Sequence, residues 1–274
     1  MTYRPVRGCM MEPEAAWGPR WVNCVHPISL QYMEIATQKR SLVVLAADLP
    51  NVEEVVELIG EVGQYITAVK THVDAIEGFS KDSWESVVQE ARKQGVLVFE
   101  DRKFADIGRV AQTQMGGLYN IRAWADIVTS HSISGPDVVD GIAAAWEAEE
   151  RVGGVLLLAQ MSSRENLLKD GYTKETLAIG RGSPHVMGFI GNGSSSKDVS
   201  ALRELAGEER MIWTPGVSLS AEEGVLGQRY GKPSDASRAG SDAIIGGSGI
   251  HGSSAPLEAA KEFAEASWEA LLER

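Results

Sequence analysis

Eight short apolar runs recur along the chain, and each is followed by a polar stretch that is compatible with a helix. The runs are near-continuously apolar and rich in Val, Ile and Leu, which is typical of strands buried on both faces of a parallel sheet. They occupy residues 42–48, 65–71, 96–101, 126–131, 152–161, 185–192, 210–217 and 242–249. Eight strand–helix units predict an α/β fold of the (β/α)8 TIM-barrel type, and an open doubly wound sheet is the alternative.

The chain of 274 residues is 43% hydrophobic, which is enough for a sizeable core. No linker or break in composition divides it, so we expect residues 26–274 to form a single barrel domain. Residues 26–40 predict a helix before the first strand. Residues 1–25 lack a periodic apolar pattern and predict an irregular N-terminal arm.

The net charge of −12 argues against nucleic acids and anionic membranes as partners, because both require a basic surface. No apolar run approaches the ~18–20 residues of a membrane span, and the N-terminus lacks the apolar core of a secretory signal. Cys9 and Cys24 have no metal-ligand spacing. A disulfide between them is the alternative to two reduced thiols, and reduced thiols fit the cytoplasmic location that we expect.

Charged side chains end three successive predicted strands, namely Asp48, then Lys70, then Asp101 with Lys103. In a barrel, functional residues gather at this end of the strands. Asp101 and Lys103 are two residues apart, so both can face the barrel mouth. Alternating cations and anions in a partly desolvated site keep each other ionised. Although one charged strand end is usually only solvated, this array suits a reaction that forms a carbanion and then protonates it.

The stretch FEDRKFADIG, residues 99–108, resembles the signature of the orotidine 5′-monophosphate decarboxylase family, in the form typical of its eukaryotic-type branch. The stretches LAADL, VKTHVD, LLLAQMSS, MIWTPGVSL, LGQRY and GSDAIIGGSGI occur in the family's order and at about its spacings. The resemblance covers roughly residues 25–270. It implies a (β/α)8 homodimer that converts orotidine 5′-monophosphate to UMP in pyrimidine biosynthesis, with no metal and no organic cofactor.

The resemblance also implies roles for individual residues. Lys70, Asp101, Lys103 and Asp106 would form the catalytic array, with Asp106 reaching into the site of the partner subunit. Asp101 would lie close to the substrate carboxylate. Lys103 would protonate C6 of the pyrimidine as carbon dioxide leaves.

A second set of residues would bind the substrate: Asp48, His72, Ser162, Pro215, Gln228, Tyr230, Gly247 and Ser248. Asp48 would bind the ribose hydroxyls together with Lys70. Ser162 and Pro215 would lie at the base. Gln228 and Tyr230 would contact the phosphate, and the amide of Gly247 could bind an anion.

Three positions depart from the family pattern. Ser248 stands where the family carries the arginine that grips the phosphate, and Arg is the side chain best shaped for that group. His251, Arg229 and Lys232 are candidates for a replacement cation, although His251 is more simply a helix-start or loop residue. Val110 replaces a threonine that helps bind the ribose, and Gln160 replaces a common glutamate.

These departures leave three hypotheses open. The first is decarboxylation of orotidine 5′-monophosphate with a rebuilt phosphate grip. The second is the same chemistry on unphosphorylated orotidine or a modified nucleoside or nucleotide. The third is a catalytically silent barrel that binds pyrimidine nucleotides, which the intact charge array disfavours.

Overall fold

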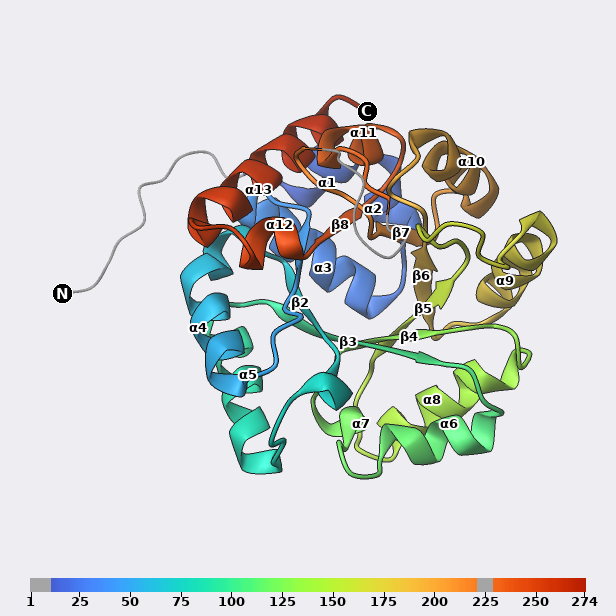
Figure 1. Ribbon diagram of the computed structural model, residues 1–274. Helices are drawn as coiled ribbons and strands as arrows, with labels where there is room; N and C mark the ends of the chain where they lie inside the picture. The colour runs from blue at the N-terminus through green and yellow to red at the C-terminus, as the bar shows by residue number, and fades with distance from the viewer. Residues whose placement is uncertain (1–10, 221–228) are drawn as a thin grey trace.

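The computed structural model describes residues 11–220 and 229–274, and its centre is a closed barrel of eight parallel strands in sequence order (Figure 1). The strands are β1 Val43–Ala46, β2 Ala68–Thr71, β3 Leu97–Phe104, β4 Ile127–Ser130, β5 Gly154–Leu158, β6 Val186–Ile190, β7 Met211–Thr214 and β8 Ala243–Gly246. β1 pairs with both β2 and β8. The predicted barrel is therefore confirmed, and the alternative of an open sheet is wrong. Seven strands lie within their predicted runs, whereas β3 continues three residues beyond its run, through Lys103 to Phe104.

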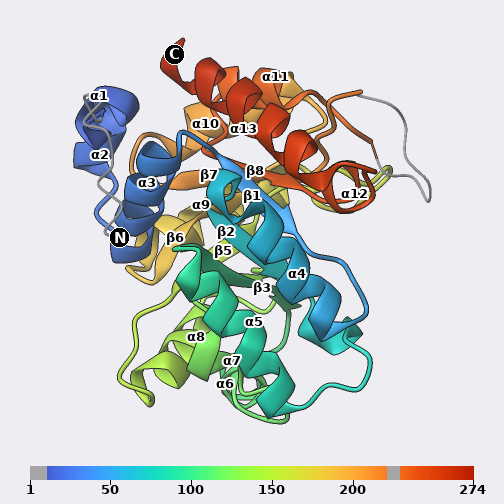
Figure 2. The same ribbon diagram turned by 90° about the vertical axis from the view of Figure 1, so that its left-hand side faces the viewer.

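Helices cover the outside of the barrel (Figure 2). They are α1 Pro13–Trp17, α2 Pro19–Asn23, α3 Pro27–Lys39, α4 Val52–Val62, α5 Lys81–Lys93, α6 Gly108–Met115, α7 Ile121–Trp124, α8 Asp137–Glu147, α9 Asp170–Gly182, α10 Ser196–Ala206, α11 Pro233–Arg238, α12 Ser248–His251 and α13 Pro256–Leu272, with the 3-10 turns η1 Gly63–Tyr65 and η2 Val73–Ala75. No helix in this described part of the chain is long and apolar enough to cross a membrane.

Local sequence explains where these helices begin and which face they bury. In α5, Ser80 forms a capping box with Ser83, which satisfies backbone amides at the helix start. Trp84, Val87 and Val88 follow at helical spacing and are buried against the barrel. This pairing of a polar cap with one apolar stripe orients the helix on the sheet.

The barrel interior is filled by side chains. Phe99 and Trp213 meet edge to face with ring centroids 5.5 Å apart, and Tyr32 of α3 packs on Trp213 at 4.8 Å. The Tyr32 hydroxyl lies 3.0 Å from the carbonyl of Asp242, at the amino-terminal end of β8. Helix α3 thus closes this end of the barrel, and a ligand must enter at the opposite end.

The segment expected to be an irregular arm contains the two short helices α1 and α2, so that expectation is wrong for residues 13–23. Each helix begins on a proline, whose fixed φ and missing N–H suit a first helical position. The Trp17 indole donates to Thr37 Oγ1 of α3 at 3.0 Å. The buried Arg20 pairs with Asp242. Cys24 is a free, buried thiol, and Cys9 lies outside the described residues.

Candidate active site

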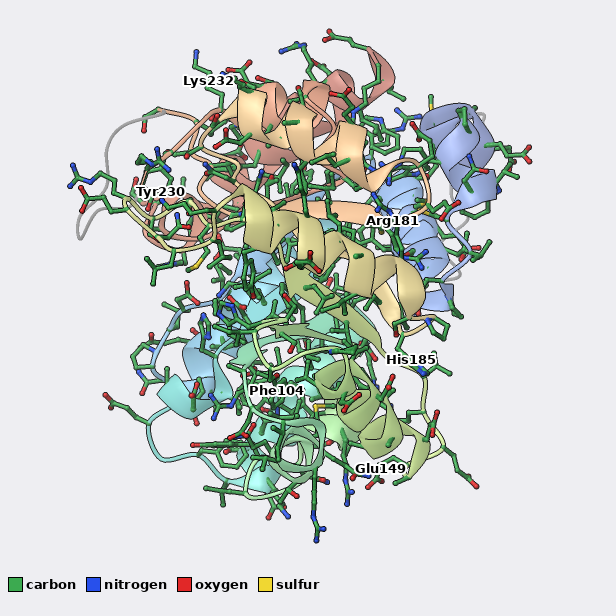
Figure 3. The ribbon with its side chains drawn as sticks, turned by 90° about the vertical axis from the view of Figure 1, so that its right-hand side faces the viewer. Phe104, Glu149, Arg181, His185, Tyr230 and Lys232 are labelled. Carbon is green, nitrogen blue, oxygen red and sulfur yellow. The ribbon has the colours of Figure 1, made fainter. Side chains whose placement is uncertain are left out.

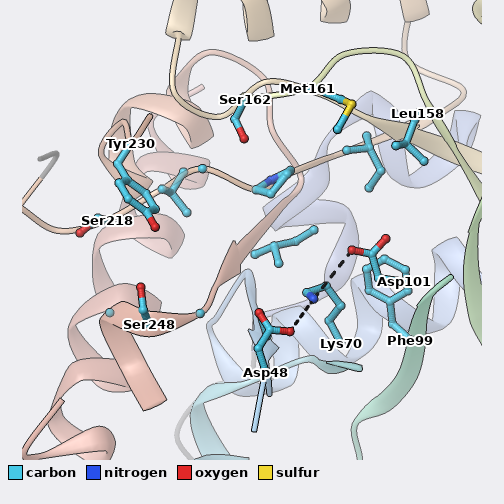
Figure 4. A pocket seen from close by; sticks show the side chains of 18 of the residues that line it. Asp48, Lys70, Phe99, Asp101, Leu158, Met161, Ser162, Ser218, Tyr230 and Ser248 are labelled. Atoms are coloured by element: carbon cyan, nitrogen blue, oxygen red, sulfur yellow. Dashed lines mark hydrogen bonds and ion pairs between the residues drawn. The ribbon is translucent and has the colours of Figure 1, made fainter. Parts of the chain in front are cut away.

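A cavity of about 340 Å³ opens at the carboxyl-terminal ends of the strands (Figure 4). It gathers most of the predicted site residues: Asp48, Lys70, Asp101, Lys103, Ser162, Pro215, Tyr230, Gly247 and Ser248. His72 lies at an adjoining hollow that shares Asp48. Gln228 lies outside the described residues. The strand ends therefore bring together residues that are up to 200 positions apart in the sequence.

Lys70 lies between two carboxylates on the floor of this cavity. Its Nζ is 2.9 Å from Asp48 Oδ1 and 3.8 Å from Asp101 Oδ2 (Figure 4). The residue is only 5% exposed. A lysine so deeply buried needs anionic neighbours to stay charged, and the strand ends on either side of β2 supply them.

Asp101 and Lys103 form the closest ion pair in the cavity. The Lys103 ammonium lies 2.6 Å from Asp101 Oδ2. The backbone of Lys103 has a φ of +52°, in the left-handed region that residues with a Cβ rarely adopt. The ladder between β3 and β4 shifts register between Glu100 and Phe104, so this local irregularity aims the lysine at the aspartate.

The electrostatics of the cavity favour an ionised Asp101 beside a neutral His72. Burial acts to raise the pKa of Asp101, but the charges of Lys103 and then Lys70 outweigh it and hold that pKa below its ordinary value. Burial, followed by the charge of Lys70, lowers the pKa of His72. His72 Nε2 lies 3.5 Å from Asp101 Oδ2, so a neutral imidazole can donate to the carboxylate.

Glu100, which precedes Asp101 on β3, does not line this cavity. The residue is fully buried and accepts hydrogen bonds from Thr71 Oγ1 at 2.7 Å and from the Val73 amide at 3.1 Å. Burial raises its pKa to about 8. Alternation along β3 turns it away from the face that carries Asp101. Glu100 thus ties the middle of β3 to the end of β2 and to η2, outside the cavity.

The other end of the cavity carries hydroxyls and backbone amides. Tyr230 and Ser248 face the same space (Figure 4), and His251 is the basic side chain lining this end in the described part of the chain. Arg229 is close by, since its Nε donates to the Ser162 carbonyl at 3.1 Å. Lys232 is exposed and does not line the cavity, and Figure 3 shows it above Tyr230, nearer the top of the molecule in that view. Of the three candidate cations, His251 is therefore the one that lines the cavity.

Asp106 and Val110 lie outside the cavity of their own chain. Asp106 is exposed, and its carboxylate accepts a hydrogen bond from the Ile107 amide at 2.8 Å. Val110 is half-buried on α6. Gln160 does line the cavity, but it donates to the Asp198 carbonyl and accepts from the Asn192 amide, which fixes its orientation. Within residues 11–220 and 229–274, no cluster of His, Cys, Asp or Glu has the composition of a metal site.

Comparison with known proteins agrees with this geometry. Residues 41–263 match the model of the family described as "Orotidine 5'-phosphate decarboxylase / HUMPS family". Orotidine 5′-phosphate decarboxylase of Paracoccidioides brasiliensis is 37% identical over 91% of this chain and 92% of its own length. The enzyme of that name from Penicillium nalgiovense is 35% identical over the same shares. The crystal structure of orotidine 5′-phosphate decarboxylase from Pyrococcus horikoshii OT3 superposes with a TM-score of 0.67 at 25% identity, covering 82% of this chain and 98% of that one.

Proposed function

The chain belongs to the orotidine 5′-phosphate decarboxylase / HUMPS family, and from this premise we propose that its cavity decarboxylates orotidine 5′-phosphate to UMP. It is a carboxy-lyase of pyrimidine biosynthesis, and we propose that it acts in the cytoplasm. The observation that carries the mechanism is the Asp101–Lys103 pair, with its 2.6 Å contact at the cavity wall.

The reaction breaks the bond between C6 of the pyrimidine and its carboxylate, so carbon dioxide leaves and an electron pair stays on C6. Lys103 then donates a proton from Nζ to C6. The ammonium groups of Lys103 and Lys70 stabilise the developing negative charge, because they are already held in place in a partly buried site. Asp101 faces the substrate carboxylate and keeps both ammonium groups charged. The side chains supply the charge and the proton, so we propose no metal and no organic cofactor.

The remaining cavity residues hold the substrate in this position. Asp48 and Lys70 bind the ribose hydroxyls, with His72 beside them. Ser162 and Pro215 contact the base. Tyr230 and the amide of Gly247 face the 5′ substituent, and we assign Gln228 to the same end of the substrate.

We further propose that the enzyme is a homodimer in which Asp106 completes the site of the partner subunit. Two observations support this. Asp106 is exposed and lies outside its own cavity, and Ile107 beside it is an apolar side chain that is 59% exposed. A partner that covered Ile107 would remove apolar surface from water and bring Asp106 close to a second chain.

A second candidate function is decarboxylation of an unphosphorylated or modified nucleoside. Ser248 favours it, because within the described residues no lysine or arginine lines the end of the cavity around Tyr230 and Gly247. Charge-assisted hydrogen bonds to a phosphate are worth ~1.5–3 kcal/mol each. Their loss would reduce the preference for a nucleotide.

One experiment tests both functions: kcat/KM is measured for orotidine 5′-phosphate and for orotidine at one salt concentration. We expect a strong preference for the nucleotide, with His251, Arg229 and backbone amides serving as the phosphate grip. Comparable rates on the two substrates would establish the second function. The Ser248→Arg variant provides a matched comparison, because a restored cation should raise kcat/KM for the nucleotide alone. Nucleotide binding without turnover of either compound would identify a silent barrel.

A further inference from the structure

Thr129, at the end of β4, touches both members of the catalytic pair without lining the cavity itself. The residue is 1% exposed. Its Oγ1 lies 2.8 Å from the Lys103 backbone nitrogen and 2.8 Å from Asp101 Oδ1. One hydroxyl thus bridges the main chain of the proton donor and the carboxylate that faces the substrate.

The direction of both hydrogen bonds is fixed by chemistry. A backbone N–H can only donate, so the Lys103 amide donates to Thr129 Oγ1. The single hydroxyl proton is then left for Asp101 Oδ1, which as a carboxylate can only accept. The Lys103 ammonium closes the ring by binding Asp101 Oδ2 at 2.6 Å.

The two oxygens of Asp101 therefore have different partners. Oδ1 is held by Thr129, while Oδ2 is directed at Lys103, at His72 3.5 Å away and at Lys70 3.8 Å away. The terminal torsion of an aspartate has a broad energy profile, so the orientation of the carboxylate is well defined only when one of its oxygens has a fixed partner. The same hydroxyl anchors the left-handed backbone of Lys103, whose φ of +52° is otherwise unfavourable.

We propose that Thr129 is a positioning residue of the decarboxylase: its hydroxyl sets the rotation of Asp101 and the backbone of Lys103 so that the ammonium and Oδ2 meet the substrate together. The proposal rests on the function proposed above. It predicts that the hydroxyl, rather than the size of the side chain, is what the reaction needs at position 129.

The test compares Thr129→Val, which keeps the shape and removes the hydroxyl, with Thr129→Ser, which keeps the hydroxyl. We expect Thr129→Val to lower kcat for orotidine 5′-phosphate by about 10- to 100-fold, the effect of one lost charge-assisted hydrogen bond. KM should change little, because Thr129 does not touch the cavity. Thr129→Ser should stay within about threefold of the wild type in kcat.

A second readout separates positioning from a general loss of structure. A hydrogen bond to the ionised form lowers the pKa of a carboxyl, so its removal should raise the pKa of Asp101. The acid limb of the kcat/KM profile should move to higher pH in Thr129→Val and stay in place in Thr129→Ser. Carbon-13 NMR titration of the Asp101 carboxyl, assigned with Asp101→Asn, should show the same shift without any turnover.

The proposal is overturned if Thr129→Val keeps near-normal kcat, or if Thr129→Ser is impaired as strongly as Thr129→Val, which would assign the effect to the methyl group. A wild-type protein that fails to decarboxylate either substrate would instead remove the proposed function. In that case the NMR titration still decides the point, because an unchanged Asp101 pKa in Thr129→Val would show that the hydroxyl does not hold the carboxylate.

Discussion

Lys103 is the residue on which the proposed chemistry depends, because it is the ammonium closest to Asp101 and it lines the cavity. Replacing it with alanine removes the proton donor. We expect Lys103→Ala to lower kcat by about 10²- to 10⁴-fold or more. The fold should persist, because the Lys103 side chain is one-third exposed and the hydrogen bond from the backbone amide of residue 103 to Thr129 remains. Steady-state kinetics and circular dichroism test this, with the exposed Lys93→Ala on α5 as a matched control. Near-normal turnover by Lys103→Ala would rule out the mechanism.

Glu100 makes a second prediction at the same scale, which concerns stability rather than rate. Burial raises its pKa to about 8 from an ordinary value near 4.5. Between these two pH values the native state binds more protons than the unfolded state. The contribution of Glu100 to the free energy of unfolding therefore falls as pH rises. The loss is on the order of a few kcal/mol by pH 8. Glu100→Gln should lack this pH dependence, because an amide does not ionise.

Urea unfolding from pH 5 to pH 8.5 tests the Glu100 prediction. The difference in unfolding free energy between Glu100→Gln and wild type should shift in favour of the variant as pH rises. Glu53→Gln removes an exposed carboxylate from α4 and controls for the loss of one negative charge. If the wild type and Glu100→Gln gave parallel pH profiles, the buried carboxyl would not be titrating in this range.

At the scale of elements, helix α3 depends on an unusual N-cap residue, His26. The predicted helix over residues 26–40 correctly begins at this residue. Its Nδ1 accepts a hydrogen bond from the Ile28 amide at 3.2 Å, which only a neutral imidazole can do. Burial, and then the charge of Arg210, lower the pKa of His26 to about 4. The unfolded chain takes up a proton near pH 6.5, so the stability from this site is lost as pH falls from 6.5 to 4.

Two variants separate the cap from the titration. His26→Asn keeps a cap acceptor and does not titrate, so it should lose less stability than the wild type between pH 7 and pH 4, by on the order of 3 kcal/mol. His26→Ala should cost about 1 kcal/mol at pH 7, since the cap is lost. Thermal unfolding at several pH values measures both. Equal acid sensitivity of wild type and His26→Asn would contradict the assignment.

Elements also mark the limit of what the sequence predicts. Near-continuous apolar runs locate all eight strands, because strands buried on both faces have no polar alternation. The same runs place Asp101 and Lys103 at a strand end. They do not predict that β3 continues to Phe104, or that Thr129 reaches the Lys103 amide. That contact arises from the shift in register between β3 and β4 and from the positive φ of Lys103, which depend on the neighbouring strand.

At the scale of the whole molecule, the proposed homodimer can be tested by mixing two impaired chains. Lys103→Ala retains Asp106, and Asp106→Ala retains Lys103. If Asp106 serves the partner's site, one of the two sites in a mixed dimer contains only wild-type residues. Random pairing makes half the dimers mixed, so co-refolding should restore roughly a quarter of wild-type activity.

Mixing Lys103→Ala with Asp101→Ala is the matched control, because both residues lie in the same cavity and no complete site can form. No gain in the first mixture, from a protein that light scattering shows to be dimeric, would place Asp106 outside the partner's site. An active monomer would contradict the shared site altogether.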